Sequence, residues 1–214
     1  MLDTSEVAAE QRNALQAWEY AQTNDETVFD ADPFRDELME AIGLQAVSPE
    51  EGFLQLLSFA ERGSLYSANY VAWSYASGTG VRKNEEQALT WYRRAYEGGS
   101  ERGLLDYAQC LMATGQTDEA EKVYEAGWER SLVPAVYRLI RLRLRPTLPL
   151  ADRLSWKPSL EWAAQSGHPA ARFLLSKYLF RGWFGLGLVP AGVWLICGHI
   201  AAIVRGDEDR PIAD

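Results

Sequence analysis

Small and apolar residues recur along this chain at helical spacing, and a longer period is superimposed on that spacing. Each of four small marker residues is followed four positions later by a second small residue and eight positions later by a larger one. The markers are Gly63, Gly99, Ser131 and Gly167, separated by intervals of 36, 32 and 36 residues. This period is typical of stacked helix pairs, because one pair cannot bury its apolar face alone. The sequence therefore predicts an all-α solenoid of antiparallel helix pairs.

Shorter helices are expected before the repeats. Thr4 or Ser5 can cap a first helix whose apolar positions run to Trp18, and the stretch TNDETVFDAD then interrupts it. Asp32 and Pro33 predict a new helix that ends at Gly43. The next helix should begin with a capping box formed by Ser48 and Glu51 around Pro49. The acidic DADPFRDEL segment is expected to cap helices and not to bind calcium, since it lacks the glycine and ligand spacing of an EF-hand loop.

The stretch from Gly63 to Gly99 is the clearest repeat. Its first helix should bury one face, and Gly78 and Gly80 should supply the positive backbone angles of the turn that follows. The expected inward residues of the first helix are Ser67, Val71, Ala72 and Tyr75. Those of the second helix are Ala88, Trp91, Ala95 and Tyr96.

These residues also carry a resemblance to a known family. The sequence GTGV, then Ala88, the pair Trp91 and Tyr92, Ala95 and a closing glycine resemble the Sel-one-like repeat (SLR), a relative of the tetratricopeptide repeat (TPR). The resemblance covers about residues 48 to 206. It weakens after the first repeat, where the GTGV turn is missing and then replaced by RPTLPLAD, whose prolines stop a helix. It implies a right-handed superhelical α-solenoid that serves as an interaction adaptor, often in bacterial envelope or polysaccharide assembly.

The expected organisation is an acidic N-terminal helical cap over residues 1–47, helical repeats over 48–181, an apolar segment over 182–204 and an acidic tail over 205–214. The net charge is −9, and it is concentrated in residues 1–62, which hold 14 acidic and 3 basic side chains. Nucleic-acid affinity comes mostly from clustered lysines and arginines, so nucleic acid is not an expected partner.

The run from Gly182 to Val204 carries no formal charge, and as a helix it would be about 34 Å long, enough to cross a hydrocarbon core. Three interpretations compete: a membrane anchor, a contact with a partner protein or second copy, and ordinary burial as the last repeat helix. A tail-anchored protein at the cytoplasmic face of the inner membrane is the leading expectation, with a cytoplasmic protein as the alternative. The expected anchor residues are Trp183, Phe184, Val193, Trp194, Leu195, Ile196, Ile200, Ile203 and Val204.

The resemblance also implies that the first helices line a concave, partner-binding face. The positions that should point there are Asn69, Tyr70, Trp73, Asp106, Gln109, Arg138, Arg141, Arg145, Phe173 and Lys177. Arg138, Arg141 and Arg145 should form one helical stripe for acidic groups or anionic headgroups, while Arg143 points away. A solvated helix face is the alternative interpretation of the stripe, and packing between repeats is the alternative for the aromatic residues.

No constellation in the sequence indicates catalysis, a metal or a cofactor. His168 and His199 have no acid or nucleophile nearby in sequence, and Cys110 and Cys197 are expected to be buried thiols. The N-terminus has no basic and apolar regions of a signal peptide. The leading hypothesis is a non-enzymatic adaptor for a membrane or envelope-assembly protein. The alternative is a soluble SLR enzyme acting on peptidoglycan-like or β-lactam ligands, although two non-periodic cysteines do not match the repeated disulfide framework that such proteins resemble.

Overall fold

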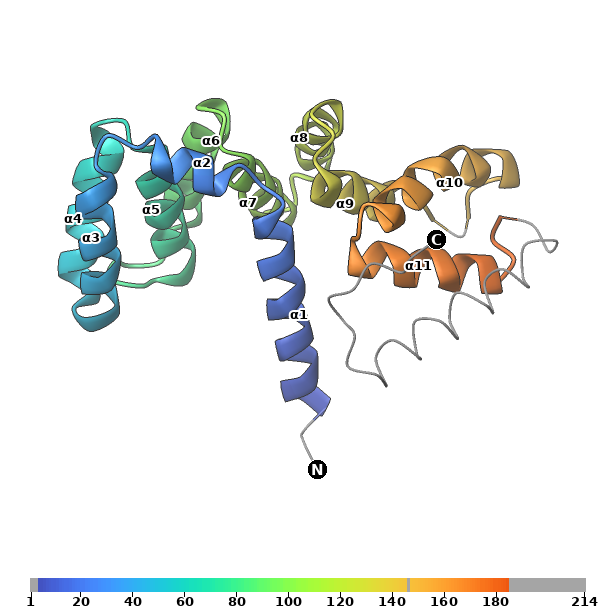
Figure 1. Ribbon diagram of the computed structural model, residues 1–214, viewed down its shortest axis with the longest axis horizontal. Helices are drawn as coiled ribbons and strands as arrows, with labels where there is room; N and C mark the ends of the chain where they lie inside the picture. The colour runs from blue at the N-terminus through green and yellow to red at the C-terminus, as the bar shows by residue number, and fades with distance from the viewer. Residues whose placement is uncertain (1–3, 146, 185–214) are drawn as a thin grey trace. The chain divides into compact units, whose positions relative to one another are not determined.

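The protein is described here by a computed structural model that places residues 4–145 and 147–184 (Figure 1). These residues are mostly helical, which confirms the predicted all-α fold. The helices are α1 (Thr4–Ala21), α2 (Asp25–Asp30), α3 (Arg35–Val47), α4 (Pro49–Glu61), α5 (Leu65–Ser77), α6 (Glu85–Glu97), α7 (Glu101–Ala113), α8 (Thr117–Glu129), α9 (Val133–Arg143), α10 (Leu150–Gln165) and α11 (Pro169–Phe180).

The helices belong to two compact units. Of the described residues, the central unit comprises 20–132, and the terminal unit comprises 4–19, 133–145 and 147–184. In the central unit, α3 to α7 each pack against the next helix, and α2 packs on α5 (Figure 1). In the terminal unit, α10 packs on both α9 and α11. The first helices of the repeats are α5, α7, α9 and α11.

The four marker residues end the helices that precede the repeats. Gly63, Gly99, Ser131 and Gly167 have φ angles of 106°, 100°, 58° and 94°. Glycine adopts this left-handed conformation without steric cost, and it commonly stops a helix there. The long period in the sequence is therefore a repeat of helix ends.

The residue after the marker caps the next helix in three of the four repeats. The side chains of Ser64, Ser100 and His168 each accept a hydrogen bond from a backbone N–H of the first turn that follows. The donors are the second small residues of the pattern, Ser67, Gly103 and Ala171. The capping side chain lies one position after the marker, and the backbone N–H that donates to it lies three positions further on. The first half of the pattern therefore spans four positions.

Close helix packing explains why the second position of the pattern is small. Ser67, Ala135 and Ala171 are fully buried. At Gly103, a Cβ would lie 2.8 Å from the Cβ of Ala95, so even alanine would push α7 away from α6. The larger third residues, such as Val71 and Leu139, fill the core between the helices.

Several predicted helix ends were wrong before the first repeat. α3 continues through Gly43 to Val47, and a Cβ at Gly43 would meet nothing within 4 Å. One glycine costs a helix only about 1 kcal/mol, so the surrounding helix formers override it. The predicted interruption contains the short helix α2. α4 does begin at Pro49, but the side chain of Ser48 makes no capping hydrogen bond.

The predicted inward residues Ser67, Val71 and Ala72 of the first helix are buried, while Tyr75 and Trp91 are half-buried and pack against the core. Gly78 and Gly80 have the expected positive φ angles of 84° and 71°. In α6, Ala88 and Ala95 are fully buried, but the third core residue is Tyr92, while Trp91 is half-buried beneath the guanidinium of Arg94. Positions 88, 92 and 95 follow the helical period, and position 91 lies at the flank of that stripe. Tyr96 is also only half-buried.

Candidate partner-binding surface

Five of the predicted partner-binding residues lie on α5 and α7 of the central unit. Trp73 and Gln109 are exposed, with 46% of Trp73 accessible to solvent. Asn69 is buried instead, and its Nδ2 donates a hydrogen bond to Ser100 Oγ at the start of α7. Tyr70 is half-buried and packs against the ring of Tyr66 on the same helix. Asp106 is half-buried.

The other five residues belong to the terminal unit. Arg141 and Phe173 are exposed, with 53% of Phe173 accessible, and Lys177 is half-buried. Arg145 lies beyond the end of α9, and its Nε donates to the carbonyl of Leu142. Arg138 pairs with Glu19. The three arginines therefore do not share one uniform solvated stripe. Arg143, as expected, has a different environment, with its guanidinium over the ring of Trp156.

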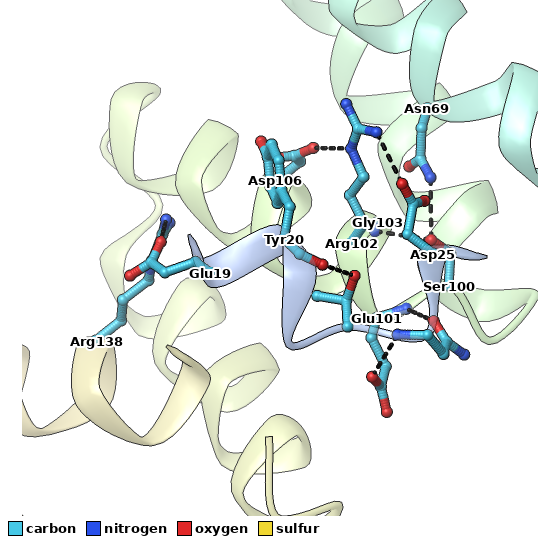
Figure 2. Close-up of polar contacts among 12 residues, drawn as sticks. Glu19, Tyr20, Asp25, Asn69, Ser100, Glu101, Arg102, Gly103, Asp106 and Arg138 are labelled. Atoms are coloured by element: carbon cyan, nitrogen blue, oxygen red, sulfur yellow. Dashed lines mark hydrogen bonds and ion pairs between the residues drawn. The ribbon is translucent and has the colours of Figure 1, made fainter. Parts of the chain in front are cut away.

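Residues 20–32, which we call the N-terminal segment, lie against the first helices of the central unit. Tyr20 Oη donates to Asp106 Oδ1 at 2.6 Å. Asn24 Nδ2 donates to the carbonyl of Gly99 at 3.0 Å, and Asn24 Oδ1 accepts from the backbone N–H of Glu101 at 2.9 Å. The carboxylate of Glu101 accepts in turn from the backbone N–H of Asn24 (Figure 2). The start of α7 is thus bound by the chain itself.

Arg102 is the centre of these contacts. Its guanidinium forms an ion pair with Asp25 at 3.0 Å and lies 3.8 Å from a carboxylate oxygen of Asp106 (Figure 2). The same group lies 4.5 Å from the centre of the Tyr20 ring and 5.6 Å from that of Tyr70, within range of cation–π attraction. Only 20% of the Arg102 side chain is exposed, so it is a mostly desolvated cation held by two acids and two aromatic rings.

The N-terminal segment continues along α5. The ring of Phe29 packs at 4.9 Å from the ring of Tyr66. Further on, Asp32 accepts a hydrogen bond from the hydroxyl of Ser64, the N-cap of α5, and another from the backbone N–H of Phe34. Asp32 is buried, so the acidic segment around it is only partly solvated.

In the terminal unit, the last residues of α1 contribute to a buried polar cluster. Glu19, only 3% exposed, pairs with Arg138 of α9 through one carboxylate oxygen and with His168 of α11 through the other (Figure 2 shows the pair with Arg138). The His168 ring lies between two aromatic rings, 5.0 Å from Trp18 and 4.2 Å from Tyr137.

The hydrogen bonds of His168 define the roles of its two ring nitrogens. Nδ1 accepts from the backbone N–H of Ala171. Nε2 is then the donor, and it faces Glu19 Oε1 at 3.3 Å. His168 thus acts as both helix cap and carboxylate donor.

The surroundings shift the pKa values of Glu19 and Arg102 in the directions that favour their charged forms. Burial alone would raise the pKa of Glu19, but the hydrogen bond from His168 and the charge of Arg138 lower it overall. Burial alone would lower the pKa of Arg102, but Asp25 and Asp106 raise it above its ordinary value. Burial and the neighbouring Tyr70 and Asp25 also raise the pKa of the Tyr66 hydroxyl. Both clusters are therefore ion pairs at neutral pH.

The sequence did not identify the residues that lie against these first helices. Glu19, Tyr20 and Asp25 lie in the predicted cap, more than 70 residues from their partners. Arg102 was not selected because its offset in the repeat differs from those of the predicted groove. The one available signal in the sequence was the difference in charge between the acidic residues 1–62 and the nearly neutral repeats.

The apolar C-terminal run falls mostly outside the described residues. Of the predicted anchor residues, Phe184 is buried in the core of the terminal unit, and Trp183 stacks on Tyr178 with ring centres 4.1 Å apart. This packing differs from the anchor role predicted for these two. Val193, Trp194, Leu195, Ile196, Ile200, Ile203 and Val204 are not described. No helix within residues 4–184 is both long and apolar enough to cross a membrane.

Metal sites and reactive thiols are built from His, Cys, Asp and Glu side chains. Across the described ranges, no group of three His, Cys, Asp or Glu side chains is arranged to hold a metal ion. Cys110 is a half-buried free thiol, and burial together with Glu85 and Asp106 raises its pKa, which disfavours the reactive thiolate. Cys197 and His199 lie outside the described residues.

Comparison with known proteins supports the fold. No family model and no curated protein matches the sequence. The crystal structure of a Sel1 repeat protein from Oxalobacter formigenes is similar, with a TM-score of 0.62 and 17% identity over 81% of this chain and 70% of that chain. So is c5321, a protective antigen present in uropathogenic Escherichia coli strains and displaying an SLR fold, with a TM-score of 0.53 and 19% identity. That match covers 68% of this chain and 33% of the antigen. The chain therefore has the SLR fold, as its resemblance to the family predicts.

Proposed function

We propose that the protein is a non-enzymatic scaffold that binds another protein through the first helices of its repeats. The observation that carries this proposal is the exposure of an aromatic ring on α11 and of an arginine on α9, both first helices of repeats. Phe173 is 53% exposed, and Arg141 is exposed. Aromatic and arginine side chains are enriched at protein interfaces, and solenoids typically use their repeated helices as binding surfaces.

An acidic segment is the partner chemistry that this surface favours. Arg141 and Lys177 supply positive charge, and Phe173 supplies apolar area. Arg138 is not available for this role in the same way, since it already pairs with Glu19. The basic contribution to partner binding is therefore assigned to Arg141 and Lys177, with Arg145 at the end of α9.

The test is a binding measurement with the double variant Arg141→Gln/Lys177→Gln. Capture of partners from the native host, followed by affinity measurement at two salt concentrations, should show weaker binding and a smaller salt dependence for the variant. Arg181→Gln is the matched control, because Arg181 is an exposed cation of the same unit. Equal binding by both variants would contradict the assignment.

The proposed partner is a membrane or envelope-assembly protein, with the scaffold attached at the cytoplasmic face of the inner membrane. The support is the uncharged run that ends at Val204, of which residues 185–204 lie outside the described part of the chain. The variant Leu195→Lys/Ile200→Lys tests the attachment, because two charges should disfavour membrane insertion. Wild type should sediment with membranes and the variant should not. Wild type found wholly in the supernatant would contradict the attachment.

A further inference from the structure

The N-terminal segment binds its own chain in the way that a peptide binds a receptor. Its contacts to α7 are made by side chains at one end of the segment: Tyr20 to Asp106, Asn24 to the first turn, and Asp25 to Arg102. The backbone of Asn24 adds a hydrogen bond to Glu101. These are directional polar contacts between segments about 77 to 86 positions apart in sequence.

The segment has little apolar attachment. No residue of α2 is buried, and Glu26 and Thr27 are exposed. The apolar part of the contact is the ring of Phe29 against Tyr66. The hydrogen bonds to α7 are part-buried, and elements with few buried apolar contacts open locally without global unfolding. The segment is therefore suited to leave while the helices beneath it stay folded.

The surface beneath the segment is specific. Arg102 provides a cation next to the ring of Tyr70, and Asp106 provides an acceptor for a hydroxyl. The backbone N–H of Glu101 and the carbonyl of Gly99 form a donor–acceptor pair that matches a carboxamide. With the N-terminal segment in place, three buried polar atoms have no hydrogen bond among the described residues. They are Asp25 Oδ1, Arg102 Nε and Asn69 Oδ1.

We propose that the N-terminal segment is a built-in competitor, and that the α5–α7 surface takes a segment of a partner protein with the same chemistry. This partner segment carries a tyrosine, followed four and five residues later by a carboxamide and a carboxylate. The inference rests on the proposed scaffold function and adds its regulation. A partner must displace the segment, so its apparent affinity is reduced by the fraction of molecules in which the surface is open.

The experiment uses the full chain and a release variant, Asn24→Ala/Asp25→Ala. Asn24 makes no capping bond within α2, so the change removes contacts to α7 without uncapping a helix. The probe is a labelled peptide of residues 20–32, added in trans and followed by fluorescence anisotropy. We expect it to bind the release variant at least about tenfold more tightly than wild type. A peptide that itself carries both substitutions should bind the release variant at least about tenfold more weakly.

The matched control is Glu26→Ala/Thr27→Ala, which alters exposed neighbours in the same segment and should bind the peptide like wild type. Equal binding by all three proteins would overturn the proposal. So would loss of hydrogen-exchange protection throughout α5–α8 in the release variant, which would make the segment part of the core. Dimers formed by exchange of the segment would assign the surface to a second copy and also overturn it. Arg141 and Lys177 belong to the terminal unit, whereas the peptide is expected to bind the central unit. The two tests can therefore fail separately.

Discussion

Two adjacent residues near the end of α1 show how differently the two units use the same stretch of chain. Glu19 pairs with Arg138 in the terminal unit, and Tyr20 bonds to Asp106 in the central unit. Arg138 and Asp106 occupy the same position of the repeat, three residues after the second small residue. Glu19 is 3% exposed and pairs with Arg138 and His168, whereas Tyr20 is half-buried at the start of a segment with little apolar contact.

The difference lies in burial and not in the number of hydrogen bonds. A buried charge that loses its partner cannot be resolvated without opening the unit, so its pair is costly to break. The hydroxyl of Tyr20 makes a part-buried hydrogen bond, whose net contribution to stability is about 0.5–1.5 kcal/mol. Glu19 is therefore buried inside the terminal unit, while the N-terminal segment lies against α5 and α7 within the central unit.

The largest effect should come from Glu19→Ala. The change leaves Arg138 and His168 Nε2 without their acceptor in a buried site, so we expect the terminal unit to lose about 3 kcal/mol of unfolding free energy. Urea denaturation measures the loss. Glu10→Ala, at an exposed position of the same helix, should change stability by less than about 0.5 kcal/mol. A similar small value for Glu19→Ala would remove the distinction between the two units.

Acidification should remove the contribution of Glu19 gradually. Its pKa in the folded protein lies below the ordinary value of 4.5, so the stability it supplies is complete above that pH and is lost as the pH falls through the folded pKa. The difference in unfolding free energy between wild type and Glu19→Gln should therefore shrink below pH 4.5. A difference that grows on acidification would contradict the prediction.

A smaller effect should separate the two roles of His168. Asparagine can still accept the N–H of Ala171, whereas alanine cannot, so His168→Asn should be more stable than His168→Ala by about 1 kcal/mol. Both variants lose the ring packing against Trp18 and Tyr137. Thermal unfolding of the pair measures the difference. Equal stabilities would show that the cap contributes nothing.

The smallest effect should come from Tyr20→Phe, which removes the hydroxyl that bonds to Asp106 and keeps the ring over Arg102. We expect the central unit to lose about 0.5 to 1 kcal/mol, the usual net value of one hydrogen bond. Gln22→Ala, at an exposed position, is the control and should be neutral. A loss as large as that of Glu19→Ala would place Tyr20 in the core and contradict the comparison.

The repeats could be predicted from the sequence because each marker has a local physical cause. Gly63, Gly99 and Gly167 adopt left-handed angles, and the caps that follow them act within four residues. Local rules were less reliable where they compete. Gly43 resembled a helix end, but its neighbours sustain the helix to Val47.

The contacts of the N-terminal segment could not be predicted, because they depend on residues far apart in sequence. Asp25 reaches Arg102 across 77 positions, and Glu19 reaches His168 across 149. Periodicity reports which face of a helix is buried, but it does not identify what covers the other face. The predicted groove included Asp106 and Arg138, but in the structure Asp106 contacts Tyr20 and Arg138 contacts Glu19.

Native-state hydrogen exchange of the full chain tests the central distinction most directly. The backbone N–H groups of Val28 and Ala31 report on α2, and that of Glu19 reports on the end of α1. The account predicts that the first two exchange through small, denaturant-insensitive openings while α5–α7 stay protected. It also predicts that Glu19 exchanges together with α9–α11. Exchange of Val28 and Ala31 with the same free energy and denaturant dependence as α5–α7 would contradict the account.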